Sequence, residues 1–216
     1  MVVTDSNLEQ LEHIRFIAIE GVNGAGKTTL QRKVCAYLKE KGFNAVTTME
    51  PGSTEIGRAL REIVLKRKGI TPICELFLFC ADRAQHVAEV IRPAINDGKI
   101  VVTDRYYYST AVFQGEGRGI DKQIVSTLNE VAIEGVRPDL VFLLDLPPEE
   151  GLRRNRQKLD KDRFEDEDPS FQRKIREGFL NIARESKEPF YIIDAAQSQE
   201  NVWESALKVL NVAFKG

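Results

Sequence analysis

The stretch RFIAIEGVNGAGKT, residues 15–28, joins a short apolar run to a glycine-rich turn that ends in a lysine and a threonine. Gly21, Gly26, Lys27 and Thr28 match the pattern G-x-x-x-x-G-K-[ST]. Glycines let a backbone wrap closely around phosphate oxygens, while the lysine reaches the β- and γ-phosphates and the hydroxyl binds Mg²⁺. A glycine-rich turn that binds nothing is the alternative, but a position between a strand and a helix favours a nucleoside triphosphate site.

The turn alone does not separate a switch, a motor and a kinase. A guanine-specific switch normally carries Asn-Lys-x-Asp late in the chain, and that string is absent. A small kinase needs a second pocket for its acceptor, which the rest of the chain must supply. The residues predicted to bind the donor nucleotide are Gly21, Val22, Asn23, Gly24, Ala25, Gly26, Lys27, Thr28 and Thr29.

Short apolar runs rich in β-branched residues recur along the chain, at 16–19, 44–49, 99–104, 140–146 and 190–194. Several are almost continuously apolar, which is typical of strands buried on both faces of a parallel sheet. Helical stretches separate them, so we expect an α/β fold with three layers and a mostly parallel sheet of five strands. Ligands bind beyond the carboxyl ends of such strands, where Gly21–Thr28, Glu50–Gly52, Asp104–Arg105 and Asp145 are expected.

Composition narrows the class of protein. The formal charge of −2 argues against a nucleic-acid binder that relies on net positive charge. The first fifteen residues lack the apolar core of a secretory signal, and no apolar run approaches the length of a membrane span. Cys35, Cys74 and Cys80 form no zinc-binding pattern and are expected to be small buried thiols in a reducing cytoplasm. We expect one domain over residues 1–216.

Two segments are candidates for the acceptor side. LFLFCADRAQHV (76–87) puts Phe79 and Arg83 on one helical face, where a ring and a cation would suit a nucleobase. A core phenylalanine beside an ion-paired arginine is the alternative. In TDRYYYSTAVFQGEGRG (103–119), Asp104 ends a strand where a carboxylate can hold Mg²⁺, and Arg105 suits a phosphate. A buried Asp–Arg ion pair is the alternative there.

A third segment is strongly basic. Six basic residues lie between 153 and 163, and the acidic stretch EDED follows them. A solvated helix face with surface ion pairs would have this composition. A mobile lid that closes arginines over the transferring phosphoryl group would have it too.

Taken together, these motifs resemble the bacterial type of thymidylate kinase, a family of P-loop kinases, from about residue 14 to 194. The family's phosphate loop corresponds to IEGVNGAGKTT, its second-strand signature to EPGSTEIG (50–57) and its base-pocket helix to LFLFCADRAQHV. Its DR motif corresponds to DRYYYSTAVFQGEGRG and its lid to PEEGLRRNRQKLDKDRFE (148–165). The resemblance implies a P-loop fold with a helical lid at about 150–168. It also implies phosphorylation of thymidine monophosphate by ATP.

For the acceptor, the resemblance implies that Phe79 stacks on thymine, that Arg83 bonds its edge and that Arg105 grips its phosphate. Thr110 stands where the family has a small polar contact to the base, and Arg61 where a further pocket arginine is expected. The positions implied to bind the substrate are Glu50, Arg61, Phe79, Arg83, Arg105, Thr110, Phe113 and Gln114.

For the transfer step, the resemblance implies that Asp104 serves Mg²⁺ together with Thr28. Gly24 stands where some relatives carry arginine, so the catalytic arginines are expected in the lid. The implied catalytic residues are Lys27, Arg105, Arg154, Arg156 and Arg163, with Lys158 assisting. The implied partners are ATP, thymidine monophosphate, Mg²⁺ and a second copy of the chain, with no nucleic acid and no membrane.

The chain departs from the family pattern at several positions. Asn23 replaces the usual acid, so that an amide still accepts a hydrogen bond but brings no charge to the cation. Met49 replaces a frequent arginine, Phe113 a frequent tyrosine and Ser53 a common glycine. These changes leave open a kinase for another or broader set of nucleoside monophosphates. A regulatory module that binds nucleotide without transfer is the alternative from another class.

Overall fold

A computed structural model describes residues 2–4, 8, 11, 13–155, 163–164 and 167–214 of the chain. Its six strands form one sheet, in which every pairing is parallel. Their order across the sheet is β1 (Val2–Val3), β6 (Phe190–Asp194), β5 (Leu140–Asp145), β2 (Phe16–Gly21), β4 (Ile100–Asp104) and β3 (Ala45–Met49). The predicted α/β class and its five strands are confirmed. The additional strand, β1, is too short to appear in a hydrophobic pattern.

The central strands carry the core. Every residue of β2 is buried, and so are residues 140–144 of β5. Helices cover both faces of these strands, which is why their sequences are continuously apolar instead of alternating. Glu20 interrupts the apolar sequence of β2 with a charged side chain. It is fully buried and lies directly before the glycine-rich turn.

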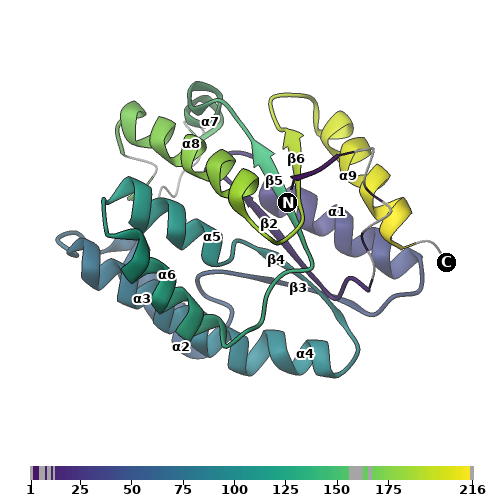
Figure 1. The fold of residues 1–216 in the computed structure, drawn as a ribbon, viewed down its shortest axis with the longest axis horizontal. Coiled ribbons are helices and arrows are strands. Elements are labelled where there is room, and N and C mark those ends of the chain that lie inside the picture. The colour runs from purple at the N-terminus through teal and green to yellow at the C-terminus, as the bar shows by residue number, and fades with distance from the viewer. Residues whose placement is uncertain are drawn as a thin grey trace.

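Helices form a layer on each face of the sheet (Figure 1). On one face α1 (Lys27–Glu40) packs against β2, β3 and β4 and against α9 (Gln199–Ala213). The connections after β3 run along the sheet in the opposite direction, so right-handed crossovers put their helices on the other face. There α4 (Arg92–Asn96) contacts β4, α5 (Tyr107–Thr110) contacts β2 and α8 (Pro169–Glu185) contacts β5.

Three helices pack on one another outside this layer, at the lower left of Figure 1: α2 (Glu55–Lys66), α3 (Pro72–His86) and α6 (Lys122–Ile133). The π-helical turns η2 (Val87–Ile91) and η3 (Ala111–Gly117) continue α3 and α5, and α7 (Pro148–Asn155) follows β5. Thr54, Thr71 and Asp168 accept backbone N–H bonds at the starts of α2, α3 and α8. These caps fix where each helix begins.

The carboxyl ends of the strands meet at one edge of the sheet because all strands are parallel. Met49 of β3 pairs in register with Asp104 of β4, which also pairs with Ile19 of β2. The glycine-rich turn, Glu50 and Arg105 follow directly after these strands. The predicted gathering of polar signals at this edge is therefore confirmed.

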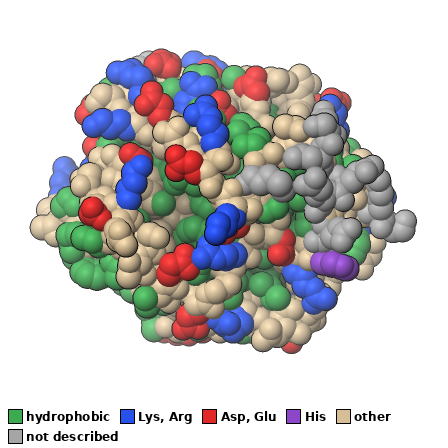
Figure 2. Space-filling model, in the orientation of Figure 1, with side chains coloured by type: hydrophobic (Ala, Val, Ile, Leu, Met, Phe, Trp, Pro, Cys, Tyr) green, Lys and Arg blue, Asp and Glu red, His purple; other side chains and the backbone are tan. Residues whose placement is uncertain are grey.

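The surface agrees with the balanced composition. Acidic and basic side chains are interspersed over the face seen in Figure 2. Cys35 and Cys80 are buried as expected, but the expectation is wrong for Cys74, which is exposed in the first turn of α3. Within the described residues, no helix combines the length and apolarity that a membrane crossing requires.

Candidate functional site

The glycine-rich turn connects β2 to α1 and depends on its glycines. Gly21, Gly24 and Gly26 have positive φ angles of 139°, 82° and 93°, a region that other residues rarely adopt. A Cβ atom on Gly21 would lie 2.5 Å from the carbonyl oxygen of Leu144 in β5. No side chain caps the first turn of α1, so the amides of that turn face an open cavity and suit phosphate oxygens.

Lys27 and Thr28, the first residues of α1, turn their side chains to different neighbours. Nζ of Lys27 donates to the carbonyl oxygens of Gly21 at 3.2 Å and Val22 at 2.9 Å, within the turn itself. The hydroxyl of Thr28 donates to Oδ2 of Asp104 at 2.5 Å. The predicted pair is thus brought together, because Thr28 at the start of α1 lies beside Asp104 at the end of β4.

This pair fits a magnesium ion by the chemistry of its donors. A hydroxyl and a carboxylate are hard oxygen ligands, and Mg²⁺ usually takes only one or two from the protein, with the rest from phosphates and water. The described residues contain no group of three or more acids, histidines and cysteines that could enclose a metal. The surrounding cavity of about 980 Å³ is lined by residues of both sides, including Lys27, Arg61 and Arg105.

Arg105 lies between the glycine-rich turn and a second cavity, which is described below. Its φ angle of 71° is in the left-handed region, a strained conformation that clusters at functional sites. Its guanidinium donates to Asn23 Oδ1 at 2.5 Å, to Ser109 Oγ at 2.8 Å and to the Gly21 carbonyl at 3.1 Å. The amide of Asn23 therefore orients Arg105 instead of adding charge to the site.

Glu20 supports this arrangement from below and was not among the predicted site residues. Its carboxylate accepts hydrogen bonds from the backbone N–H groups of Tyr106 and Ser109 and from the Ser109 hydroxyl. Burial raises the pKa of Glu20, and the charge of Arg105, 4.0 Å away, opposes that rise. An acid inside an otherwise apolar strand was the signal that sequence offered for it.

A second cavity opens beside Arg105, with about 560 Å³ of empty space that includes open solvent at its mouth. It brings together all the positions predicted to bind the substrate: Glu50, Arg61, Phe79, Arg83, Arg105, Thr110, Phe113 and Gln114. Its other lining residues were not predicted for the acceptor: Asn23, Pro51, Leu65, Tyr106, Ser109 and Phe164. Arg61 donates to the Pro51 carbonyl at 2.6 Å and lines both this cavity and the one beside the turn.

Arg83 is the most firmly held side chain of the cavity. It is only 1% exposed, and it donates to Glu50 at 2.8 Å, Asn129 at 2.9 Å and Thr110 at 3.0 Å. Burial disfavours its charge, but the neighbouring Glu50 carboxylate, together with Cys80 and Tyr106, raises its pKa on balance. The ion-pair interpretation of Arg83 is thus confirmed. Arg83 also lines the cavity, and its contact with a base stays a prediction. Glu50 and Thr110, which were predicted to bind the substrate, accept hydrogen bonds from Arg83.

Aromatic rings form the other wall. Phe164 packs on Phe79 with ring centroids 6.0 Å apart and on Phe113 at 5.6 Å. Gln114 donates to the buried carboxylate of Glu75 at 2.6 Å. Phe164 comes from the far end of the basic segment, so a residue about 85 positions after Phe79 completes the pocket. No local pattern could have announced that contact.

The predicted lid arginines are distributed over two places. Arg163 forms an ion pair with Glu75 and donates to the carbonyl of Val64 at 2.6 Å. It lines neither the second cavity nor the one beside the turn, although its neighbour Phe164 lines the second cavity. Arg154 donates to Glu150 at 2.8 Å and lines the cavities on both sides of the turn. Arg156 and Lys158 lie outside the described residues.

A third cavity, of about 940 Å³, adjoins the turn on the side of α9. Gly24, Ala25, Gly26 and Thr29 of the predicted donor site line it. The loop after β6 and the start of α9 supply residues that sequence analysis missed: Ala195, Gln197, Ser198, Gln199, Val202 and Trp203. A polar stretch directly after the last predicted strand was the signal that was available.

Comparisons with known proteins agree with this geometry. The family model described as thymidylate kinase matches residues 19–206. Among curated proteins, the thymidylate kinase of Maridesulfovibrio salexigens is 43% identical over 93% of this chain and 97% of its own length. That of Oleidesulfovibrio alaskensis is 44% identical over 92% and 98%. The solved structure of thymidylate kinase from Ehrlichia chaffeensis matches with a TM-score of 0.74 and 32% identity, covering 90% of this chain and 97% of that one.

Proposed function

The chain belongs to the thymidylate kinase family, and from that premise we propose how its residues share the work of phosphoryl transfer. It phosphorylates thymidine monophosphate to thymidine diphosphate, with ATP as the donor. The predicted alternative, a kinase for another or broader set of nucleoside monophosphates, is not favoured by relatives of this similarity. The single observation that supports our assignment of roles is the pair of cavities that meet at Arg105 and Asn23.

On the donor side, the turn and the start of α1 bind the phosphates of ATP. The phosphates take the amides of the first turn, and Lys27 exchanges its bonds to the Gly21 and Val22 carbonyls for phosphate oxygens. The nucleoside of ATP then lies in the cavity formed with the loop after β6 and α9. Thr28 and Asp104 would hold Mg²⁺, which when bound neutralises charge on the phosphates.

On the acceptor side, the thymine ring stacks on Phe79, and Arg83 bonds its edge. A guanidinium has five N–H groups, and the bonds of Arg83 to Glu50, Asn129 and Thr110 use three of them. Its Nη2 also lies 2.8 Å from Oε2 of Glu50, so among the described residues one N–H, on Nη1, is left for a ligand. Arg105 binds the acceptor phosphate, because it lies where the two cavities meet.

The reaction itself needs positioning more than proton transfer. The second pKa of a phosphate monoester is about 6, so the attacking oxygen is largely deprotonated near neutral pH. The protein aligns two polyanions and stabilises the charge of the passing phosphoryl group. We assign that stabilisation to Lys27 and Arg154, with Arg156 of the undescribed segment as a further candidate. Arg163, which is paired with Glu75, supports the acceptor wall.

Release of ADP in the presence of ATP and Mg²⁺ tests this function. We expect thymidine monophosphate to stimulate release strongly, and the other common nucleoside monophosphates to stimulate it far less. Stimulation by a different nucleotide would reassign the substrate while keeping the chemistry. Nucleotide binding without stimulation by any acceptor would support the regulatory module instead.

We also propose that two copies associate through the face formed by α2, α3 and α6. Large apolar side chains are exposed on these helices: Ile56, Ile63, Ile73, Phe77, Ile124 and Val131. Apolar side chains also gather at the left of Figure 2. A contiguous patch of this kind usually marks an interaction site. Sedimentation equilibrium should give a dimer that Phe77→Glu dissociates, and a monomeric wild-type protein at micromolar concentration would contradict the proposal.

A further inference from the structure

A chain of buried side chains leads away from the acceptor pocket behind Arg83. The two oxygens of Glu50 have different partners: Oε2 accepts from Arg83 at 2.8 Å, and Oε1 lies 2.9 Å from Nδ1 of His86. Glu50 is 5% exposed and His86 is fully buried. An ionised carboxylate can only accept hydrogen bonds, so Nδ1 of His86 carries the proton in this contact.

The far side of His86 is fixed as well. Its Nε2 lies 2.5 Å from the hydroxyl of Thr48, which in turn lies 2.8 Å from the hydroxyl of Ser53. Ser53 accepts from the backbone N–H of Met49 at 2.9 Å and donates to the carbonyl of Met49 at 2.7 Å. The chain of side chains thus ends on the backbone at the end of β3. Ser53, one of the departures from the family pattern, is its last member.

The helix places the two partners of Glu50 together. Arg83 and His86 are three residues apart in α3 and therefore lie on one face of the helix. A carboxylate held at one oxygen can rotate about its last bond, whereas a second partner at the other oxygen fixes its plane. Since both Nε and Nη2 of Arg83 lie 2.8 Å from Oε2 of Glu50, the direction of the remaining N–H of Arg83 depends on that plane.

We propose that His86 is a positioning residue for acceptor recognition: it holds Glu50, and Glu50 holds Arg83 at the angle that reads the thymine edge. His86 does not line the acceptor cavity and acts only through Glu50. This inference rests on the base contact proposed for Arg83. Thr48 and Ser53 extend the same support, with an effect that decreases along the chain.

Steady-state ADP release by the full chain tests the proposal, with thymidine monophosphate and ATP varied in turn. His86→Ala should raise the KM for thymidine monophosphate about tenfold or more, the usual effect of losing a hydrogen bond to a charged group. The KM for ATP should stay within about twofold. His86→Gln retains a donor toward Glu50 and should have a smaller effect. Tyr37→Phe, which removes a partly buried hydroxyl bonded to Asn211, is the matched control and should leave both values unchanged.

A double-mutant cycle with Arg83→Lys separates the possible outcomes. Lysine keeps the charge beside Glu50 but lacks the planar fork, so it should itself raise the KM for thymidine monophosphate. In that background, His86→Ala should add less than about twofold, because its effect acts through Arg83. An undiminished effect of His86→Ala there, or equal changes in both KM values, would overturn the proposal.

Loss of the role of His86 and loss of the base contact of Arg83 give different kinetic results. If Arg83→Lys impairs acceptor binding but neither His86 variant does, the role of His86 is refuted and that of Arg83 stands. If Arg83→Lys has no effect on the acceptor KM, the base contact is refuted and the role of His86 falls with it. If His86→Ala unfolds below the assay temperature, His86→Gln replaces it in the double-mutant cycle. The change in the KM for thymidine monophosphate, with and without Arg83→Lys, then tests the role of His86.

Discussion

The acceptor pocket and the donor side of the site differ in how their cations are held. In the acceptor pocket, Arg83 is buried and bonded to three side chains from different elements. On the donor side, Arg154 is partly exposed and bonded to Glu150, which it shares with Arg153 on the same helix. Lys27 is buried, and its Nζ donates to two carbonyls of its own turn.

This difference follows from the task of each side. Selecting one base requires donors in fixed directions, and a buried charge costs folding energy that only good pairing offsets. Transferring a phosphoryl group requires cations that can exchange one partner for another as charge moves. The acceptor pocket is therefore built before the substrate arrives, while the donor side keeps bonds that phosphates can replace.

Removing the amino group of Lys27 should have the largest effect. Lys27→Ala takes away a charge that faces the transferring group, and we expect kcat to fall about 10³-fold or more. Binding of thymidine monophosphate should change little, because Lys27 does not line the acceptor cavity. Steady-state kinetics measure the first effect and equilibrium binding the second. Lys39→Ala, an exposed position in α1, is the control, and a Lys27→Ala enzyme as active as this control would refute the assignment.

Asp82 allows the cost of the prebuilt pocket to be measured. Burial and the neighbouring Glu50 raise its pKa from 3.8 to about 7, although the N–H of Gly52 donates to it. The native state therefore keeps a proton that the unfolded chain releases, and stability falls as pH rises from about 4 to 7. Asp82→Asn removes this loss. It should raise the free energy of unfolding by about 2–4 kcal/mol at pH 8 and by much less at pH 4.

Urea unfolding of both proteins at the two pH values checks this prediction. The difference in the free energy of unfolding between Asp82→Asn and the wild-type protein must increase with pH. An advantage of the same size at pH 4 and pH 8 would mean that burial does not raise the pKa of Asp82. Ionisation of Asp82 would then leave the free energy of unfolding unchanged.

Asn23 lies where the two sides meet and should have the smallest effect. Its Oδ1 accepts from Arg105 at 2.5 Å, and an aspartate would accept the same bond. We expect Asn23→Asp to change the KM for thymidine monophosphate by less than about threefold, and Asn23→Ala to raise it about three- to tenfold through loss of one hydrogen bond. Steady-state kinetics of the pair decide. A large change in Asn23→Asp alone would show that charge at this position matters more than orientation.

Much of the fold and the donor site followed from local sequence. The glycine-rich turn is contiguous, and buried strands have apolar runs that appear without knowledge of partners. The acceptor residues came from the family resemblance, since Phe79 and Arg83 alone fit an ordinary core equally well. The structure then explained Ser53, whose hydroxyl closes the chain behind His86.

The remainder depended on contacts between distant segments. Asn129 meets Arg83 from 46 positions away, and Arg163 meets Val64 from 99. By composition, Arg163 and Arg154 were equal candidates for the lid. Tertiary packing places Arg163 against Glu75 and Val64, and Arg154 beside the glycine-rich turn. Trp203 and the loop after β6 join the donor site by the same long-range assembly.

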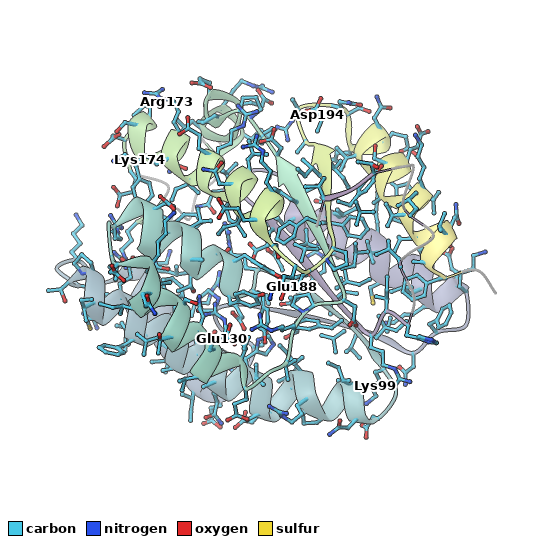
Figure 3. The ribbon with its side chains drawn as sticks, in the orientation of Figure 1. Lys99, Glu130, Arg173, Lys174, Glu188 and Asp194 are labelled. Atoms are coloured by element: carbon cyan, nitrogen blue, oxygen red, sulfur yellow. The ribbon has the colours of Figure 1, made fainter. Side chains whose placement is uncertain are left out.

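An arginine remote from the site supplies a control for charge alone. Arg137 donates to Glu130 of α6 at 2.6 Å and to Glu188 at 3.1 Å, two acids labelled in Figure 3. Arg137 pairs with two acids, whereas Arg83 pairs with one, and its side chain is 40% exposed. Because Arg137 lines none of the three cavities, Arg137→Ala should leave the kinetics unchanged.

The comparison of the two sides is tested most directly by the kinetics of Arg105→Ala and Arg154→Ala against Arg137→Ala. Arg105→Ala should raise the KM for thymidine monophosphate about 10- to 100-fold, as expected for loss of a charged phosphate contact. Arg154→Ala should lower kcat about 10²- to 10³-fold and leave that KM within about threefold. Equal, small effects of both variants, or a raised acceptor KM in Arg154→Ala with normal turnover, would contradict the division between a selecting pocket and a transferring side.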